Sequence, residues 1–456
     1  MTPRHLLLTI TCRLAGLFIP AALLAFADPA ARLAELKASA ERGDAVAQYS
    51  LGVMYERGDG VPKLTTEAAK WYRKAADQDF AAAQFNLGVL YANGVGVPIN
   101  RVEAIAWWRR AAGQGDADAQ YNLGLMYANG TGVAKDGAEA LKCFRQATDR
   151  GHAVAPFRMG LMYERGDGVP RDRDRALACY RTAAERGFID AQRRLGEMYA
   201  RGDGAPRDPV ESVKWWRKVA EQGDAVAQYN LGLAHANGDG VPKDSAEAVR
   251  WYRLAAEQGF AQARSNLGLM YAHGDGVPKD SAEAAKWYRQ AAELGFAEAQ
   301  SDLGLLYASG DGVAKDDSEA AKWYRLAAEQ GLARACHNLG VLCTFGRGVP
   351  KDSAEAVKWF RLAAEQGFVA SMHNLAVALL NGDDAASRLV EAHAWLSASG
   401  ALGFAPSHEV AHALESRMTP GQLAESGALA RGRIEKFQPG AGPGGPAPVS
   451  LLPGKP

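Results

Sequence analysis

The sequence predicts an all-α protein in which pairs of helices stack one after another into a solenoid. A Leu-Gly pair recurs at steps of 36 residues from Gly52 to Gly340, and tryptophan recurs at the same interval from Trp71 to Trp395. A fixed period of this length is typical of repeat architectures. A chain of 456 residues would ordinarily suggest about three domains, but the period predicts one array of ten repeats over residues 44–403.

Each repeat reads as two helices, as residues 224–259 illustrate. Asp224 is the expected N-cap of the first helix, and the glycines of segment 237–240 end it because they can adopt positive φ. Asp244 and Glu247 form a D-x-x-E start for the second helix, which caps free N–H groups. The glycine of the Leu-Gly pair would cost an isolated helix about 1 kcal/mol. We therefore expect another helix to pack closely against it.

The first 27 residues are expected to be a secretory signal peptide. A basic start without acids precedes an apolar run over residues 14–27, and an A-x-A pattern ends at Ala27. Cleavage before Asp28 would place the protein in the periplasm or the medium. The alternative is a lipoprotein with Cys12 as the lipidated residue. No later segment is apolar and long enough to span a membrane.

The two ends of the array differ from its repeats. Residues 28–43 are predicted to form an N-terminal capping helix, in which a polar residue stands where the repeats carry tryptophan. Residues 404–437 are predicted to form two C-terminal capping helices. Residues 438–456 are rich in Gly and Pro and are expected to be a disordered tail.

The charge balance restricts the class of partner. The chain carries 52 Lys and Arg against 52 Asp and Glu, with no basic block. This balance argues against nucleic acid or an anionic membrane as the main partner. The sequence predicts no cofactor and gives no oligomeric state.

The repeat pattern resembles that of the Sel-1-like repeats, a branch of the tetratricopeptide superfamily. It reads A-x-A-Q-x-N-L-G-x-x-Y-x-x-G-x-G-V followed by E-A-x-K-W-Y-R-x-A-A-E-Q-G, and it covers residues 44–403. The resemblance implies a right-handed superhelical solenoid with the first helix of each repeat on its concave side. It also implies a non-enzymatic scaffold or adaptor of the bacterial cell envelope. The family shares a fold and not a reaction, so no partner follows from it.

A row of first-helix positions is the candidate binding surface on that concave side. We number these positions by the first repeat, as positions 46, 49, 53 and 57. Aromatic residues, which are enriched at binding hot spots, dominate position 49 in the first half of the chain. Position 49 is occupied in chain order by Tyr49, Phe85, Tyr121, Phe157, Arg193, Tyr229, Ser265, Ser301, His337 and His373. A ligand is expected mainly along repeats one to six. Alternatively, position 49 is half-buried and merely fills space between helices.

An HExxH string is the main argument for an enzyme. His408 and His412 would lie on one face of a helix to bind zinc, with Glu409 as general base. No metzincin-like continuation follows, and the string lies in the predicted capping region. We expect a plain capping helix without metal, and a zinc-dependent hydrolase is the alternative.

A β-lactamase-like hydrolase is the second enzymatic alternative, and the cysteine pattern bears on it. Some members of the resembled family carry a disulfide in each repeat and are linked to β-lactam binding, but this chain lacks that pattern. Cys143 and Cys179 are one repeat apart, which exceeds the roughly 7 Å limit for a bridge. Cys336 and Cys343 are two helical turns apart, or about 10 Å. All four are expected to be buried thiols. No S-x-x-K string occurs, so the serine β-lactamase motif is absent.

Overall fold

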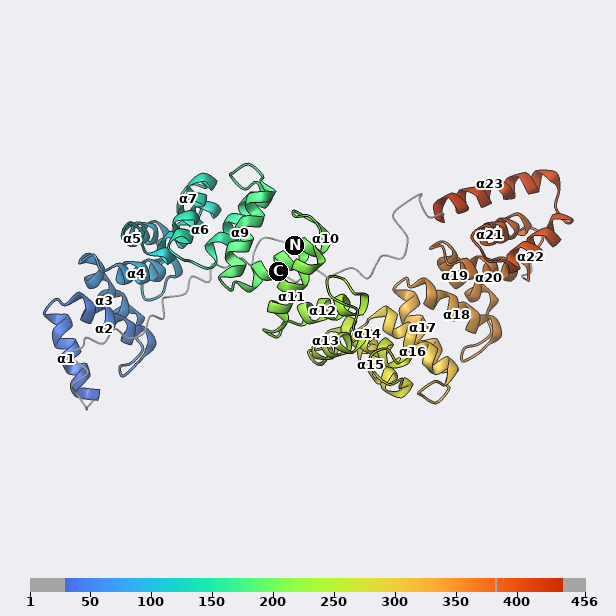
Figure 1. Cartoon of the computed structure of the whole chain (residues 1–456), viewed down its shortest axis with the longest axis horizontal. Helices are drawn as coiled ribbons and strands as arrows, with labels where there is room; N and C mark the ends of the chain where they lie inside the picture. The colour runs from blue at the N-terminus through green and yellow to red at the C-terminus, as the bar shows by residue number, and fades with distance from the viewer. Residues whose placement is uncertain (1–28, 382–383, 438–456) are drawn as a thin grey trace. The chain divides into compact units, whose positions relative to one another are not determined.

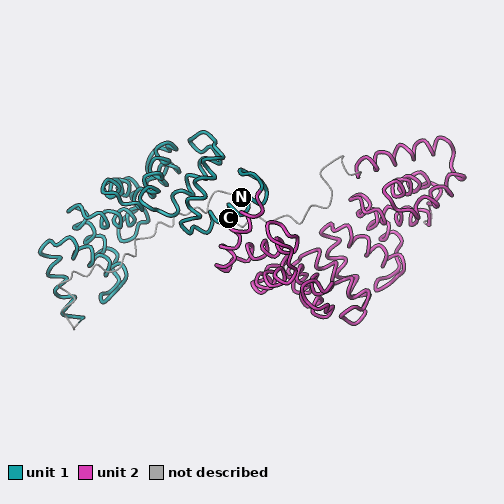
Figure 2. The backbone as a smooth tube through the Cα atoms, viewed as in Figure 1, with its two compact units in different colours: residues 1–207 teal, residues 208–456 magenta. Residues whose placement is uncertain are grey.

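The computed structural model describes residues 29–381 and 384–437. Within these ranges it consists of 23 α-helices and contains no strand (Figure 1), which confirms the all-α solenoid prediction. The expected signal peptide and the Gly/Pro-rich tail lie outside the described residues. The chain divides into two compact units, residues 1–207 and 208–456 (Figure 2).

Unit 1 comprises α1 to α10, of which α1 precedes the repeats and the others alternate as first and second helices. Their bounds are α1 Pro29–Glu41, α2 Ala45–Arg57, α3 Thr65–Asp77, α4 Ala81–Asn93, α5 Arg101–Gly113, α6 Ala117–Asn129, α7 Gly137–Asp149, α8 Ala155–Arg165, α9 Arg173–Glu185 and α10 Ile189–Arg201.

Unit 2 continues the same alternation from α11 and ends in two helices beyond the repeats. Their bounds are α11 Pro209–Ala220, α12 Ala225–Asn237, α13 Ser245–Glu257, α14 Ala261–His273, α15 Ser281–Glu293, α16 Ala297–Ser309, α17 Asp317–Glu329, α18 Ala333–Phe345, α19 Ser353–Ala364, α20 Val369–Leu380, α21 Leu389–Ala401, α22 Pro406–Glu415 and α23 Pro420–Phe437.

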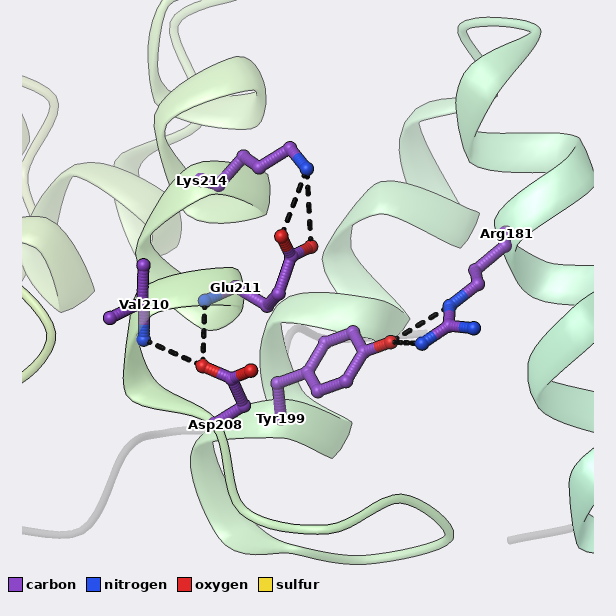
Figure 3. Close-up of polar contacts among 6 residues, drawn as sticks. All are labelled: Arg181, Tyr199, Asp208, Val210, Glu211 and Lys214. Carbon is purple, nitrogen blue, oxygen red and sulfur yellow. Dashed lines mark hydrogen bonds and ion pairs between the residues drawn. The ribbon is translucent and has the colours of Figure 1, made fainter.

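The helix caps form as the sequence predicts. The Asp224 carboxylate accepts from the Ala227 N–H, and the next helix of that repeat starts at Asp244, whose side chain accepts from the Glu247 N–H. Gly238 ends the first helix at φ 80°, in the left-handed region. Figure 3 shows the same cap at α11, where Asp208 accepts from two backbone N–H groups. Side-chain caps therefore satisfy N–H groups that would otherwise lack partners.

The glycine of the Leu-Gly pair lies against an aromatic ring of the second helix. A Cβ added to Gly52 would lie 2.6 Å from the Tyr72 ring, and one added to Gly88 would lie 2.5 Å from Trp108 Nε1. Both rings are fully buried. The predicted close approach is confirmed, and it fixes one side of the first helix against its own second helix.

Glutamine side chains join several repeats to the helix before them. Gln48 Nε2 donates to the Ala40 carbonyl at 2.9 Å, and Gln48 Oε1 accepts from Gln78 Nε2 at 2.8 Å. The same two bonds recur for Gln84 with Gln114, Gln228 with Gln258 and Gln300 with Gln330. We call this set the glutamine ladder. It satisfies buried amides and the last carbonyls of the preceding helix.

A second recurring contact joins the second helix of one repeat to the first helix of the next. The Arg181 guanidinium donates to the Tyr199 hydroxyl in unit 1 (Figure 3). Arg109 and Tyr127 form the same bond at 2.8 Å, and Arg253 and Tyr271 form it at 2.7 Å in unit 2. Both units are thus joined internally by the same polar chemistry.

The helices after the repeats pack against α21. His393 on α21 pairs with the Ser426 hydroxyl of α23, and the Arg433 guanidinium lies 3.7 Å from the centre of the Trp395 ring. Lys436 Nζ donates to the Glu365 carbonyl at 3.1 Å. These contacts cover an apolar helix that no further repeat follows, as expected of a cap.

Candidate protein-binding surface

The candidate surface runs along one side of each first helix, at positions 46, 49, 53 and 57. Positions 46, 53 and 57 follow one another along this side at helical spacing. Position 49 precedes position 53 by four residues, so the two side chains are neighbours on the helix surface. Whether position 53 is accessible therefore depends on what stands at position 49.

Three of the aromatic residues predicted for the surface lie in the core. Tyr49, Phe85 and Tyr229 are at most 2% exposed. The Tyr49 ring centre is 5.7 Å from that of Tyr72 and 5.2 Å from that of Phe80. This corrects the expectation that these rings are accessible, because each fills the space between its own repeat and the next. For these three residues the space-filling alternative describes the geometry.

Tyr121 and Phe157 are half-buried in the same layer. Tyr121 stacks on His152 with ring centres 4.3 Å apart and accepts from Arg158 Nε at 3.3 Å. The Phe157 ring centre is 5.1 Å from that of Phe188. Their exposed edges could contact a partner, but most of each ring serves packing.

Arg193, His337 and His373 at position 49 also contact other side chains within the chain. Arg193 pairs with Asp190 at 3.0 Å. His337 Nδ1 lies 2.8 Å from the Ser371 hydroxyl, and His373 Nδ1 lies 2.9 Å from the hydroxyl of Ser407. Burial lowers the pKa of both histidines, so they are neutral at pH 7. Binding by the position-49 row stays a prediction.

Position 53, which belongs to the predicted row, carries exposed leucines that the sequence analysis did not name. Val53 and Val89 are 3% and 2% exposed, because Tyr49 and Phe85 cover them. Leu269 and Leu305 are 44% and 51% exposed. Serine precedes each of these leucines by four residues and covers little of it. In the sequence, these exposed leucines are marked by a serine four residues earlier.

The exposed apolar surface continues on α18 and α20. Phe345, at position 57, is 69% exposed. It lines a depression of about 140 Å³ together with Val341, Val377 and the Asn374 amide. We call the set of Leu269, Leu305, Val341, Phe345 and Val377 the unit 2 apolar row.

Ten successive segments of 36 residues match the Sel1 repeat, without a gap from residue 45 to residue 404. The chain belongs to the Sel1 repeat family.

Two solved Sel1-type structures are similar to this chain. One is a protective antigen present in uropathogenic Escherichia coli strains, which displays an SLR fold. It is 34% identical, with a TM-score of 0.79, over 90% of this chain and 88% of that chain. The other is a Sel1 repeat protein from Oxalobacter formigenes, 36% identical, with a TM-score of 0.53, over 66% of this chain and 87% of that chain. No curated protein matches the chain.

Membership of the Sel1 family supports a coarse functional statement. Sel1 and related repeats generally bind proteins, and Sel1 proteins are typically non-enzymatic scaffolds. Among the helices that the structure describes, none combines the length and apolar character needed to cross a bilayer.

The HExxH string lies on α22, after the last Sel1 repeat. His408, Glu409 and His412 are all exposed. His412 Nδ1 lies 2.9 Å from a carboxylate oxygen of Glu415, which forms an exposed ion pair when the imidazole is protonated. Over residues 29–381 and 384–437, no three His, Cys, Asp or Glu side chains are grouped as a metal site would require.

The four cysteines in the described part of the chain are free thiols. Cys143, Cys336 and Cys343 are buried as predicted, whereas Cys179 is half-buried, which corrects the prediction for that residue. Burial raises the pKa of Cys143, Cys179 and Cys343 to about 11. Thiols with raised pKa values stay protonated and are poor nucleophiles. Cys336 occupies the position that glutamine holds in the ladder, and its Sγ lies 3.7 Å from the Ala328 carbonyl oxygen.

Proposed function

We propose that this Sel1 protein is a non-enzymatic adaptor of the bacterial cell envelope that holds a protein or peptide on its concave face. It would act in the periplasm or outside the cell after cleavage near Ala27. The description of the similar Escherichia coli protein as a protective antigen supports a location that antibodies can reach.

The unit 2 apolar row is the observation that carries this proposal. Large apolar side chains that are exposed together on one surface are typical of protein interaction sites. Leu269, Leu305 and Phe345 are exposed at neighbouring first helices, where burial would contribute about 1.5–3 kcal/mol for each side chain. The Asn374 amide beside them can both donate to and accept from a peptide backbone. An extended segment with spaced aliphatic residues matches this chemistry.

The test compares two pairs of exposed residues. Leu305→Ser with Phe345→Ala removes the centre of the unit 2 apolar row, and Leu254→Ser with Leu326→Ser is the control on second helices. The control leucines are 37% and 45% exposed, so both variants should fold, as circular dichroism would check.

Affinity purification from the native bacterium would provide the readout. We expect the row variant to lose a protein that the wild type and the control retain. Equal retention by both variants, or loss in the control alone, would contradict the proposed surface.

The absence of catalysis is part of the proposal and has its own test. Glu409→Gln should leave every partner interaction unchanged, and the purified protein should contain no stoichiometric zinc. One equivalent of zinc that disappears in His412→Ala would overturn this part of the proposal.

A further inference from the structure

A second depression, in unit 1, has different chemistry from the unit 2 apolar row. It lies between the first helices of repeats four and five, α8 and α10, and has a volume of about 590 Å³. We call it the arginine pocket. Its lining consists of Leu161, Glu164, Arg165, Arg171 and Arg194.

The arginines of these two repeats depart from the rest of the array. Position 50 carries Arg158 and Arg194 in repeats four and five, whereas the eight other copies have Asn, Ser or Asp. Position 57 carries Arg165 and Arg201, and the first repeat is the one other copy with arginine there. Eight repeats fold without arginine at both positions, so packing does not require it. The substitutions add positive charge to a single stretch of the first-helix surface.

Glu164 and Glu197, the two acids beside Arg194, both engage that arginine. Glu164 uses both carboxylate oxygens, one toward Arg194 and one toward the Tyr180 hydroxyl. Glu197 lies 3.5 Å from Arg194 as well. No ion pair or hydrogen bond engages the guanidinium groups of Arg165 and Arg171 within the described part of the chain, and both residues are exposed. Two unpaired guanidinium groups therefore border a pocket that also exposes part of Leu161.

We propose that the arginine pocket binds an acidic peptide segment of the protein partner, so this inference rests on the proposed function. A glutamate or aspartate carboxylate would bind between Arg165 and Arg171, where planar guanidinium groups can each donate two hydrogen bonds. An aliphatic side chain of the same segment would contact Leu161. The pocket would thus select acidic segments and accelerate their association at low ionic strength.

The direct test uses a fluorescein-labelled peptide of Glu-Glu-Leu repeats and fluorescence anisotropy on the full chain. Arg165→Glu with Arg171→Glu should weaken binding by about tenfold or more, since charge-assisted hydrogen bonds are lost and repulsion is introduced. Lys243→Glu with Lys279→Glu is the matched control, because it changes the net charge equally at exposed loop positions of unit 2. The control should bind like the wild type, and wild-type affinity should fall as salt is added.

Two outcomes would overturn the inference. One is equal binding of a Lys-Lys-Leu peptide or equal loss in both charge variants, which would leave no selectivity at the pocket. The other is displacement of the peptide by inorganic polyphosphate at equal charge concentration, which would indicate a general anion site.

The proposed function can fail or stand separately from this inference. The Leu305→Ser and Phe345→Ala variant should bind the acidic peptide normally, because both changes lie outside the arginine pocket. If the two arginine substitutions leave peptide binding intact while the unit 2 variant still loses its native partner, the pocket assignment is wrong and the adaptor function stands.

Discussion

Repeats two and eight have the same backbone plan and opposite surfaces. In repeat two, Phe85 and Val89 are both at most 2% exposed, whereas in repeat eight Ser301 is buried and Leu305 is 51% exposed. In these two repeats, the aliphatic side chain is buried where a ring stands four residues earlier and exposed where a serine stands there. The repeat fold tolerates either arrangement, so this position belongs to the core in some repeats and to the surface in others.

Removing the ring from repeat two should have the largest effect. Phe85→Ala should lower the free energy of unfolding by about 3–5 kcal/mol, because it opens a cavity in the core. The loss should be local, with faster hydrogen exchange around α4 and α6 and little change in distant repeats. Leu269→Ala is the control and should cost about 0.5 kcal/mol or less at its exposed site. Uniform loosening of all ten repeats would contradict the distributed stability expected of a solenoid.

A glycine pair tests the close contact between helices in the same region. Gly88→Ala places a Cβ 2.5 Å from Trp108 Nε1 and should cost about 1–3 kcal/mol through overpacking. Gly113→Ala meets no atom within 4 Å, so it should stabilise the helix by up to about 1 kcal/mol. Urea unfolding of both variants would measure the difference. A neutral Gly88→Ala would show that the Trp108 ring can move aside.

Acidification should lower the folding stability of unit 2 through its partly or fully buried histidines. Burial lowers the pKa of His235, His337, His373 and His393, all of which lie in unit 2. The unfolded chain, with pKa values near 6.5, therefore binds these protons first as the pH falls. Stability is complete above about pH 6.5 and is lost as the pH falls toward the folded-state values.

The measurement is thermal unfolding of the full chain at about pH 7.5 and about pH 5.5. We expect the wild type to lose more stability on acidification than His337→Gln with His373→Gln. An equal loss would show that other groups carry the pH dependence.

The smallest expected effect comes from giving repeat eight the ring that repeat two carries. Ser301→Tyr should place a ring over Leu305 and stabilise α16 by about 0.2–0.5 kcal/mol. The same change should reduce partner capture, since it covers part of the unit 2 apolar row. Destabilisation beyond about 1 kcal/mol would indicate overpacking and would count against the covering explanation.

The sequence predicts those features that depend on a residue and its near neighbours. The caps at Asp224 and Asp244 and the turn at Gly238 form as expected, because each needs a side-chain oxygen or a positive φ at one place. The period also predicts the stacking of helix pairs. These local and periodic features account for the fold.

The candidate surface was harder to predict, because it depends on which of two adjacent residues faces inward. The sequence drew attention to Trp71 and its equivalents, yet the fully buried ring is the next residue, as at Tyr72, Trp108 and Tyr252. The tryptophan row is partly buried at Trp71 and Trp287. The tryptophan positions and the positions that follow them both repeat every 36 residues, so the period alone does not show which of the two is more buried. The accessibility of Tyr49, Phe85 and Tyr229 was misjudged for the same reason.

The glutamine ladder has a consequence for how such a chain can change length. Gln48 bonds to a carbonyl eight residues earlier and to an amide thirty residues later, and both offsets recur in other repeats. Deletion or duplication of one whole 36-residue segment restores both offsets at the new junction. Loss or gain of one such segment would therefore leave both ladder bonds of Gln48 and its equivalents intact.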